Sequence, residues 1–129
     1  MAKYATILAG LLVIGSSAYA QNVQVARSLP GFQCNALVHV WNGQGPMPPP
    51  VPEFAGPEQS AGRVGTAMST LIVDDPPKTA DGRTRVLRPN GSFAWIDSSA
   101  IGPWHAASAL SARCSAVQMT NGTYGTFAK

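Results

Sequence analysis

Charged side chains are scarce in this chain. Only 12% of its 129 residues are charged, and nine basic against six acidic residues give a formal net charge of +3. Proteins that bind nucleic acid usually present a clustered basic face, and no run of basic residues occurs here. Arg83, Arg85 and Arg88 come nearest, and we interpret them as the solvent side of a strand. We therefore predict no nucleic-acid partner.

The chain also lacks long segments suited to helices. All 11 prolines and 11 of the 13 glycines lie after residue 20. Both residue types destabilise helix interiors, because proline removes a hydrogen bond and glycine loses the most backbone entropy. A helical bundle is excluded. Short strands joined by many turns fit this composition, and we predict an all-β fold.

Only one long apolar run is present, at the N-terminus. Residues 5–14 (ATILAGLLVI) follow Lys3 and precede the small residues at 18–20. This three-part pattern is typical of a secretory signal peptide, and the run is shorter than the roughly 20 residues of a membrane span. We predict a signal peptide over 1–20, a mature chain that is periplasmic or secreted, and no membrane insertion after cleavage. An uncleaved N-terminal helix is the alternative.

Cysteine occurs only twice, at Cys34 and Cys114. An even count in a small exported chain favours a disulfide, and closing a loop of about 80 residues contributes roughly 4–5 kcal/mol in the chain-entropy model. The alternative is a reactive or metal-binding thiol pair. It lacks support, because there is no CxxC motif and neither cysteine has a histidine at ligand spacing. We predict a structural Cys34–Cys114 bridge.

Turn residues divide the rest of the chain into short candidate strands. Residues 21–31 are predicted as a flexible lead-in and residues 45–52 as a proline-rich loop with polyproline II bias. Residues 32–41 have two apolar faces, so this strand should be covered on both sides. The other predicted elements are strands over 64–73, 83–88, 92–97 and 101–104, a helical turn over 98–100, one or two helical turns over 105–113, and a closing strand or hairpin over 115–127.

Two segments carry a resemblance to a known family. The first is VPEFAGP (residues 51–57) followed by VG at 64–65, and the second is NGSFAWI (90–96) followed by Ile101 and PW at 103–104. These segments resemble the opening and closing motifs of bacterial SH3-like domains. The resemblance implies a small, partly open barrel of about five strands within a single domain over residues 32–129. It also implies N- and C-terminal extensions that are joined by the disulfide.

Three positions depart from the family pattern. Arg83 replaces a frequent aromatic residue, Ala100 replaces a frequent tyrosine, and Phe54 replaces the arginine of the opening segment. SH3 ligand grooves hold polyproline helices on aromatic side chains. We therefore predict that generic proline-rich peptides bind no tighter than about millimolar. The chain's own PxxP spacings over 46–52 either occupy the domain's own surface or form a stiff spacer.

Residues suited to catalysis are few. His39 lies in a predicted strand and His105 at an element end, while Asp74 and Asp75 precede a turn. An active site needs a positioned acid, base or nucleophile, and neither a Gly-rich phosphate loop nor a G-x-S-x-G motif occurs. We expect no enzymatic activity, no cofactor and no metal site.

The resemblance implies a non-catalytic, exported binding or adaptor domain that contacts cell-wall glycan or an envelope protein. Apolar faces with a few cations suit sugar rings or peptides. Two alternatives remain open: a secreted inhibitor that inserts the rigid loop 45–52 into a partner's cleft, or a structural subunit of an envelope assembly. The candidate contact residues are Trp41, Phe54, Arg83, Arg85, Trp104 and Tyr124.

Overall fold

The structure is a computed structural model that describes residues 22–105 and 111–129. Strands dominate it. Strands hold 47% of the residues and helices 3%, so the predicted all-β class is confirmed. The predicted signal peptide over residues 1–20 lies outside the described residues, as does the middle of the helical segment predicted over 105–113. No helix in the described part of the chain is long and apolar enough to cross a membrane.

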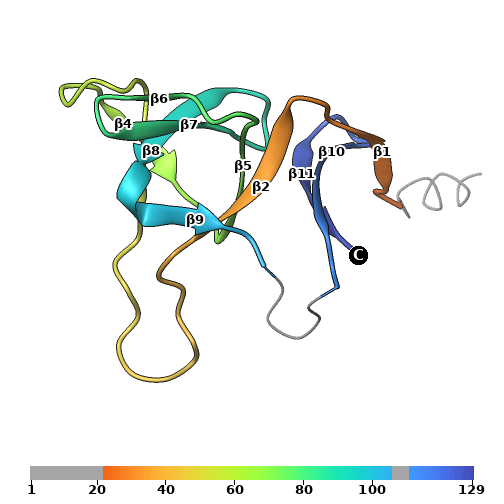
Figure 1. Ribbon diagram of the computed structural model, residues 1–129, viewed down its shortest axis with the longest axis horizontal. Helices are drawn as coiled ribbons and strands as arrows, with labels where there is room; N and C mark the ends of the chain where they lie inside the picture. Colours follow the sequence, from red (N-terminus) through yellow and green to blue (C-terminus); the bar gives the residue numbers. More distant parts are fainter. Residues whose placement is uncertain (1–21, 106–110) are drawn as a thin grey trace, which may run out of the picture.

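The described strands form two antiparallel sheets (Figure 1). In chain order the elements are β1 (Val25–Ser28), β2 (Phe32–Leu37), β3 (Pro52–Phe54), β4 (Arg63–Thr66), β5 (Thr70–Asp74), β6 (Thr79–Ala80), β7 (Arg83–Leu87), β8 (Phe93–Asp97), the 3-10 helix η2 (Ser98–Ala100), β9 (Ile101–Pro103), β10 (Cys114–Met119) and β11 (Tyr124–Ala128). The large sheet has the order β4-β3-β8-β7-β5-β2-β9, with β6 paired to β7. The small sheet has the order β1-β10-β11, so it joins the two ends of the described chain.

The inner face of the large sheet encloses the main hydrophobic core. Successive side chains of a strand point to opposite faces, and every second residue of β5, β7 and β8 is buried inside. Ile96 and Val73 are completely buried there, and Val51 and Ile101 pack against them. The buried members of this cluster are Leu71, Val73, Val86, Ala94 and Ile96.

Asn-Gly turns form the hairpins that the sequence predicts. Between β7 and β8, Gly91 has a φ of 89°, a left-handed value that glycine adopts without steric cost. The side-chain oxygen of Asn90 accepts hydrogen bonds from the Ser92 N–H at 3.0 Å and the Ser92 hydroxyl at 2.6 Å. Asn121 and Gly122 repeat this arrangement between β10 and β11.

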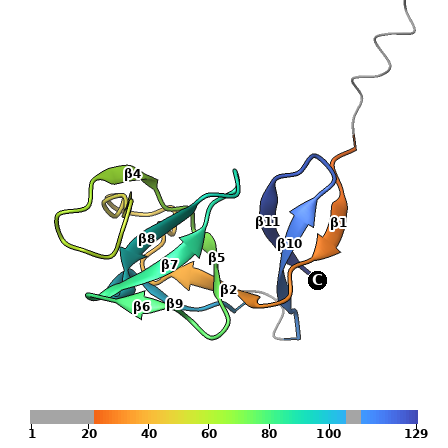
Figure 2. The same cartoon turned by 90° about the horizontal axis from the view of Figure 1, so that it is seen from above.

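The small sheet stands beside the large one and packs on its outer face (Figure 2). Leu29 and Ala116 of the small-sheet side meet Ile72 and Leu87 of the large sheet in a second buried cluster. The predicted disulfide is confirmed: Cys34 of β2 and Cys114 of β10 are joined, with their Cα atoms 6.0 Å apart. The bridge therefore connects the two sheets.

The segment over 21–31 differs from the predicted flexible lead-in. Val25–Ser28 forms β1, which pairs with β10, and Leu29 is only 8% exposed. All four residues of β1 are exposed. The strand therefore has no alternating apolar pattern for sequence reading to detect, and its order comes from pairing with a segment near the other end of the chain.

Two predicted strands have different bounds in the structure. The strand predicted over 32–41 ends at Leu37, because β9 offers only three residues to pair with β2. The following residues are exposed rather than covered on both sides: Val40 is 55% and Trp41 46% exposed. The strand predicted over 64–73 is two strands, β4 and β5, because the chain changes its pairing partner from β3 to β2 and β7.

Candidate functional site

The outer face of the large sheet gathers arginine and aromatic side chains beside the cluster that it shares with the small sheet. Arg83 and Arg85 point outward because Thr84 and Val86 point inward. The strand register pairs Arg85 with Trp95 across β7 and β8. The arginine–aromatic face, as we name it, consists of Phe32, Phe54, Arg83, Arg85, Phe93 and Trp95.

Arg83 is a buried part of this face. Its guanidinium carbon lies 3.6 Å from the centre of the Phe54 ring, which is a cation–π contact. Its Nη1 donates to the carbonyl oxygens of Gly56 at 3.2 Å and Glu58 at 2.8 Å, and its Nε lies 3.4 Å from a carboxylate oxygen of Asp97. The residue is only 3% exposed. The expectation that Arg83 is a solvent-exposed contact residue is therefore wrong: its donors hold the β3–β4 loop.

Arg85 is paired at two points with one carboxylate and remains partly exposed. Its Nε and Nη2 donate to the two carboxylate oxygens of Asp74 at 3.0 Å and 2.8 Å. This hydrogen bonding raises the pKa of Arg85 above its usual value, although burial acts in the opposite direction. Such a two-point pair fixes the guanidinium plane. The guanidinium carbon lies 3.7 Å from the centre of the Phe93 ring.

Phe93 forms the exposed centre of this arrangement. Its ring is stacked on Phe32 at a centroid distance of 6.4 Å, and the residue is 42% exposed. A large apolar residue that is fixed by neighbours and still exposed is suited to binding, because little side-chain entropy is lost when it is covered. The guanidinium of Arg85 covers one face of the ring, so a ligand meets mainly the ring edges and the cation.

Glu53 of β3 forms a separate ion pair with Arg88, which directly follows β7. The Arg88 Nε lies 3.1 Å from a carboxylate oxygen of Glu53, which is buried. Burial raises the pKa of Glu53 above 4.5, although Arg88 acts in the opposite direction. A Cβ atom at Gly65 would lie 2.9 Å from Arg88 and 3.0 Å from Glu53. Glycine at this position therefore leaves room for the pair.

The remaining candidate contact residues lie apart from this face. Trp41 is on the exposed loop after β2, where its indole N–H donates to the Gly45 carbonyl at 3.2 Å. Tyr124 packs at the edge of the cluster between the sheets. Trp104 is half-buried beside the disulfide. The structure therefore brings together Phe54, Arg83 and Arg85 of the predicted residues, but not Trp41, Trp104 or Tyr124.

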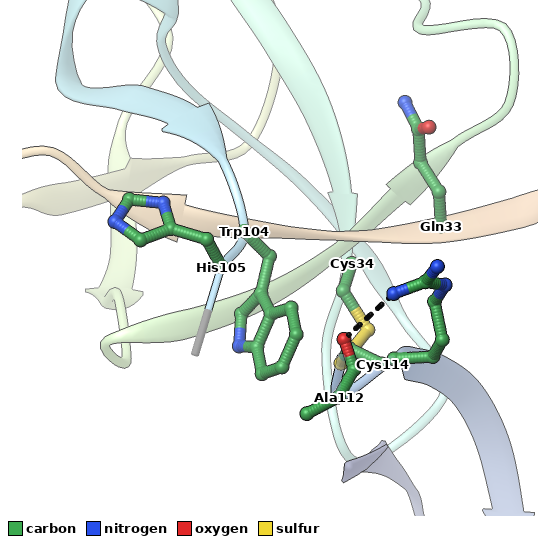
Figure 3. Close-up of a pocket in the computed structure, with 7 residues that line it drawn as sticks. Gln33, Cys34, Trp104, His105, Ala112 and Cys114 are labelled. Atoms are coloured by element: carbon green, nitrogen blue, oxygen red, sulfur yellow. Dashed lines mark hydrogen bonds between the residues drawn. A yellow bond between two sulfur atoms is a disulfide. The ribbon is translucent and has the colours of Figure 1, made fainter. Parts of the chain in front are cut away.

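Trp104 lines a cavity of about 370 Å³ at the junction of the two sheets (Figure 3). The indole ring, the Cys34–Cys114 bridge and the exposed His105 border it. His39 lies instead on the exposed segment after β2, not within a strand. No group of three or more potential metal ligands occurs within residues 22–105 and 111–129.

Comparison with known proteins gives no match, whether by family model, by curated protein sequence or by solved structure. Sequence analysis missed Phe93 and Asp74 as members of the outer face. The alternation of β8 carries a signal for Phe93, because Ala94 and Ile96 point inward. Asp74 was read only as part of a turn, and no sequence pattern shows its pairing with Arg85.

Proposed function

We propose that this protein is a non-catalytic, exported SH3-like domain that binds an envelope protein through its arginine–aromatic face. The observation that carries the proposal is Phe93, a half-exposed ring between Arg85 and Phe32. Arginine and aromatic residues dominate the energetic centres of protein interfaces. Arg85 is also fixed in advance by Asp74, which lowers the entropy lost on binding.

The helical turn before the closing strand supports the SH3-like assignment, whereas positions 54 and 83 depart from the family pattern. The family pattern has an arginine at position 54 and an aromatic residue at position 83, whereas this chain has Phe54 and Arg83. The two side chains contact each other as a cation–π pair. The 3-10 helix η2, directly before the closing strand β9, fits the family pattern.

A protein ligand fits this face better than cell-wall glycan. A sugar ring stacks on the flat face of an aromatic side chain, and guanidinium groups already cover one face of both Phe54 and Phe93. Ring edges and a partly exposed cation remain. Backbone carbonyls, carboxylates and apolar side chains of a protein partner can pair with these groups.

The buried ionisable groups support a non-catalytic role. The buried charged residues of the described chain are Glu53, Asp74 and Arg83, and each is engaged in an ion pair. These groups hold loops and strands together rather than remaining available in a cavity. Export rests on the N-terminal pattern of residues 1–20 and on the disulfide, which persists in oxidising compartments.

Capture from an envelope fraction tests the proposal. The disulfide-bonded protein should retain an envelope protein. The variant Phe93→Ala should retain at least about tenfold less of it, because truncation at the centre of an interface removes much of the binding energy. Val40→Ala is the matched control, because Val40 is also apolar and exposed but lies in the segment between β2 and β3 rather than on β8. Equal capture by both variants would contradict the proposal. Sedimentation with purified peptidoglycan, weakened by Phe93→Ala, would assign the face to glycan instead.

The proline-rich loop supports a second candidate, the inhibitor that inserts a rigid loop into a partner. The segment between β2 and β3 projects away from both sheets (Figure 1). It presents Trp41 and Met47, which is 71% exposed, next to successive prolines. If this loop is the binding element, Trp41→Ala and Met47→Ala should each abolish capture of the partner, while Phe93→Ala should leave it unchanged.

A further inference from the structure

The small sheet ends in an edge whose main-chain groups face outward. Arg113 and Lys129 exchange two hydrogen bonds, at 3.1 Å and 2.9 Å, and Met119 donates to Thr123 at 2.8 Å. In an antiparallel ladder such pairs alternate with pairs that point outward. The register Cys114–Ala128, Ala116–Thr126 and Gln118–Tyr124 is therefore the outward set. In these three pairs, the N–H and C=O groups of Tyr124, Thr126 and Ala128 on β11 point away from β10.

Most of these outward groups have no partner among the described residues. The Tyr124 N–H donates to the Pro89 carbonyl at 2.9 Å, which confirms that this side of β11 faces outward. The described chain offers no acceptor to the N–H groups of Thr126 and Ala128, and no donor to their carbonyls. Alternating donors and acceptors in a row match the backbone of another extended strand.

The other outer edges of the two sheets carry features that discourage pairing. At β4, the side chains of Arg63 and Arg88 donate to the main-chain carbonyls of Gly65 and Val64. The edge strand β9 has three residues and ends in a proline. The edge strand β1 contains a register irregularity. By contrast, β11 has five residues in regular register, with no proline and no charged side chain.

A cavity of about 330 Å³ lies beside this edge. Tyr124 and Thr126 of β11 border it on one side, and Met68, Leu71 and Leu87 border it on the other. Thr126 points to the same side as Ala116, which packs toward the large sheet. Every second side chain of a strand added to β11 would therefore point toward this cavity, whose lining is mostly apolar but includes the Glu53–Arg88 ion pair.

We infer that the edge of β11 binds an extended segment of a partner protein as an additional antiparallel or parallel strand. The outward main-chain groups give affinity, and the cavity selects apolar side chains at alternate positions. The occupant is an extended segment of a partner protein, because the main-chain donors and acceptors of Thr126 and Ala128 that are free within the described chain are matched by the main chain of another strand. None of the six residues of the arginine–aromatic face lines this cavity.

Selection from a display library of random seven-residue peptides, on the mature disulfide-bonded protein, tests this inference. Enriched peptides should have apolar residues at alternate positions. Thr126→Pro should weaken their binding at least about tenfold, because it removes one donor and places a ring at the edge. The matched control Thr126→Val keeps the N–H and the β-branched shape, and should change the affinity less than about twofold. Ala128→Pro is a second variant with the same expectation, near the chain end.

Three results would overturn the inference. The first is no enrichment of any peptide. The second is enriched peptides that bind Thr126→Pro and Ala128→Pro as tightly as the unchanged protein. The third is a dimer in sedimentation that Thr126→Pro dissociates, because the edge would then belong to a second copy. Enriched peptides should also bind Phe93→Ala unchanged, so the failure of this inference and of the proposed function are distinguishable.

Discussion

The large and small sheets differ in what stabilises them. The large sheet encloses its own cluster, with Val73 and Ile96 completely buried, and many of its neighbouring strands are close in sequence. The small sheet combines β1 with β10 and β11 from the other end of the chain. It shares its buried cluster with the large sheet through Ile72 and Leu87. A three-stranded sheet needs such packing to be stable, so the small sheet depends on the large one and on the disulfide.

The largest expected effect comes from removing the bridge between the sheets. Cys34→Ala with Cys114→Ala should lower the free energy of unfolding by about 4 kcal/mol, because the open loop regains entropy in the unfolded state. Urea denaturation measures this loss. Amide exchange should accelerate more in β1 and β10 than in β7 and β8, since the small sheet loses its covalent connection. Equal acceleration in both sheets would contradict the proposed dependence.

Truncation of the main core should affect both sheets together. Ile96→Ala should lower the free energy of unfolding by about 3 kcal/mol, because Ile96 is completely buried and the cavity left behind relaxes only partly. The small sheet should lose exchange protection at the same time, since it packs on the large sheet. The matched variant Leu29→Ala should open the small sheet and leave β7 and β8 protected. If Ile96→Ala reduced exchange protection in the large sheet alone, the small sheet would not depend on the large one.

The large sheet was largely predictable from local sequence, because its signals are local. Asn90 and Gly91 predict the turn between β7 and β8. Pro76 predicts the end of β5. The small sheet was half predictable: Asn121 and Gly122 indicate the β10–β11 hairpin, whereas β1 has no apolar face of its own. The order of β1 comes from a long-range pairing, which single-sequence periodicity does not contain.

The outer face was predicted only in part, for a physical reason. Arginines at alternate positions indicate a polar strand face, which sequence reading interprets as exposed to solvent. Arg83 is instead buried, because two carbonyls, Asp97 and the Phe54 ring satisfy its charge and its plane. These partners come from β3, the loop after it and β8, so their proximity depends on the completed sheet.

A smaller effect distinguishes the two carboxylates that pair with arginines on the outer face. Asp74→Asn should lower the free energy of unfolding by about 1–2 kcal/mol, because the partly buried Arg85 loses its charged partner. Asp97→Asn is the comparison and should cost less, about 1 kcal/mol, because the Asp97 side chain is 53% exposed and 3.4 Å from Arg83, which keeps its two carbonyl acceptors. Urea denaturation at neutral pH compares them. Equal losses would show that burial does not determine the strength of these pairs.

The smallest effect concerns Glu53, whose pKa is raised by burial. The folded state therefore holds a proton on Glu53 more tightly than the unfolded state does. This contributes stability that is fully present below pH 4.5 and is lost as the pH rises through the folded pKa. Between pH 4 and pH 7, the free energy of unfolding of the unchanged protein should fall relative to that of Glu53→Gln, whose side chain does not titrate. Urea denaturation at pH 4 and pH 7 measures the difference, and an opposite sign would mean that Arg88 outweighs burial.

The central claim is that the arginine–aromatic face contacts an envelope protein. Photo-crosslinking tests it most directly, with a benzophenone amino acid placed at position 93 in one protein and at position 40 in another. Both positions hold exposed apolar residues, at 42% and 55% exposure, so the probe is tolerated at each. An adduct with one envelope protein is expected from position 93 and none from position 40. No adduct from position 93, or equal adducts from both positions, would contradict it.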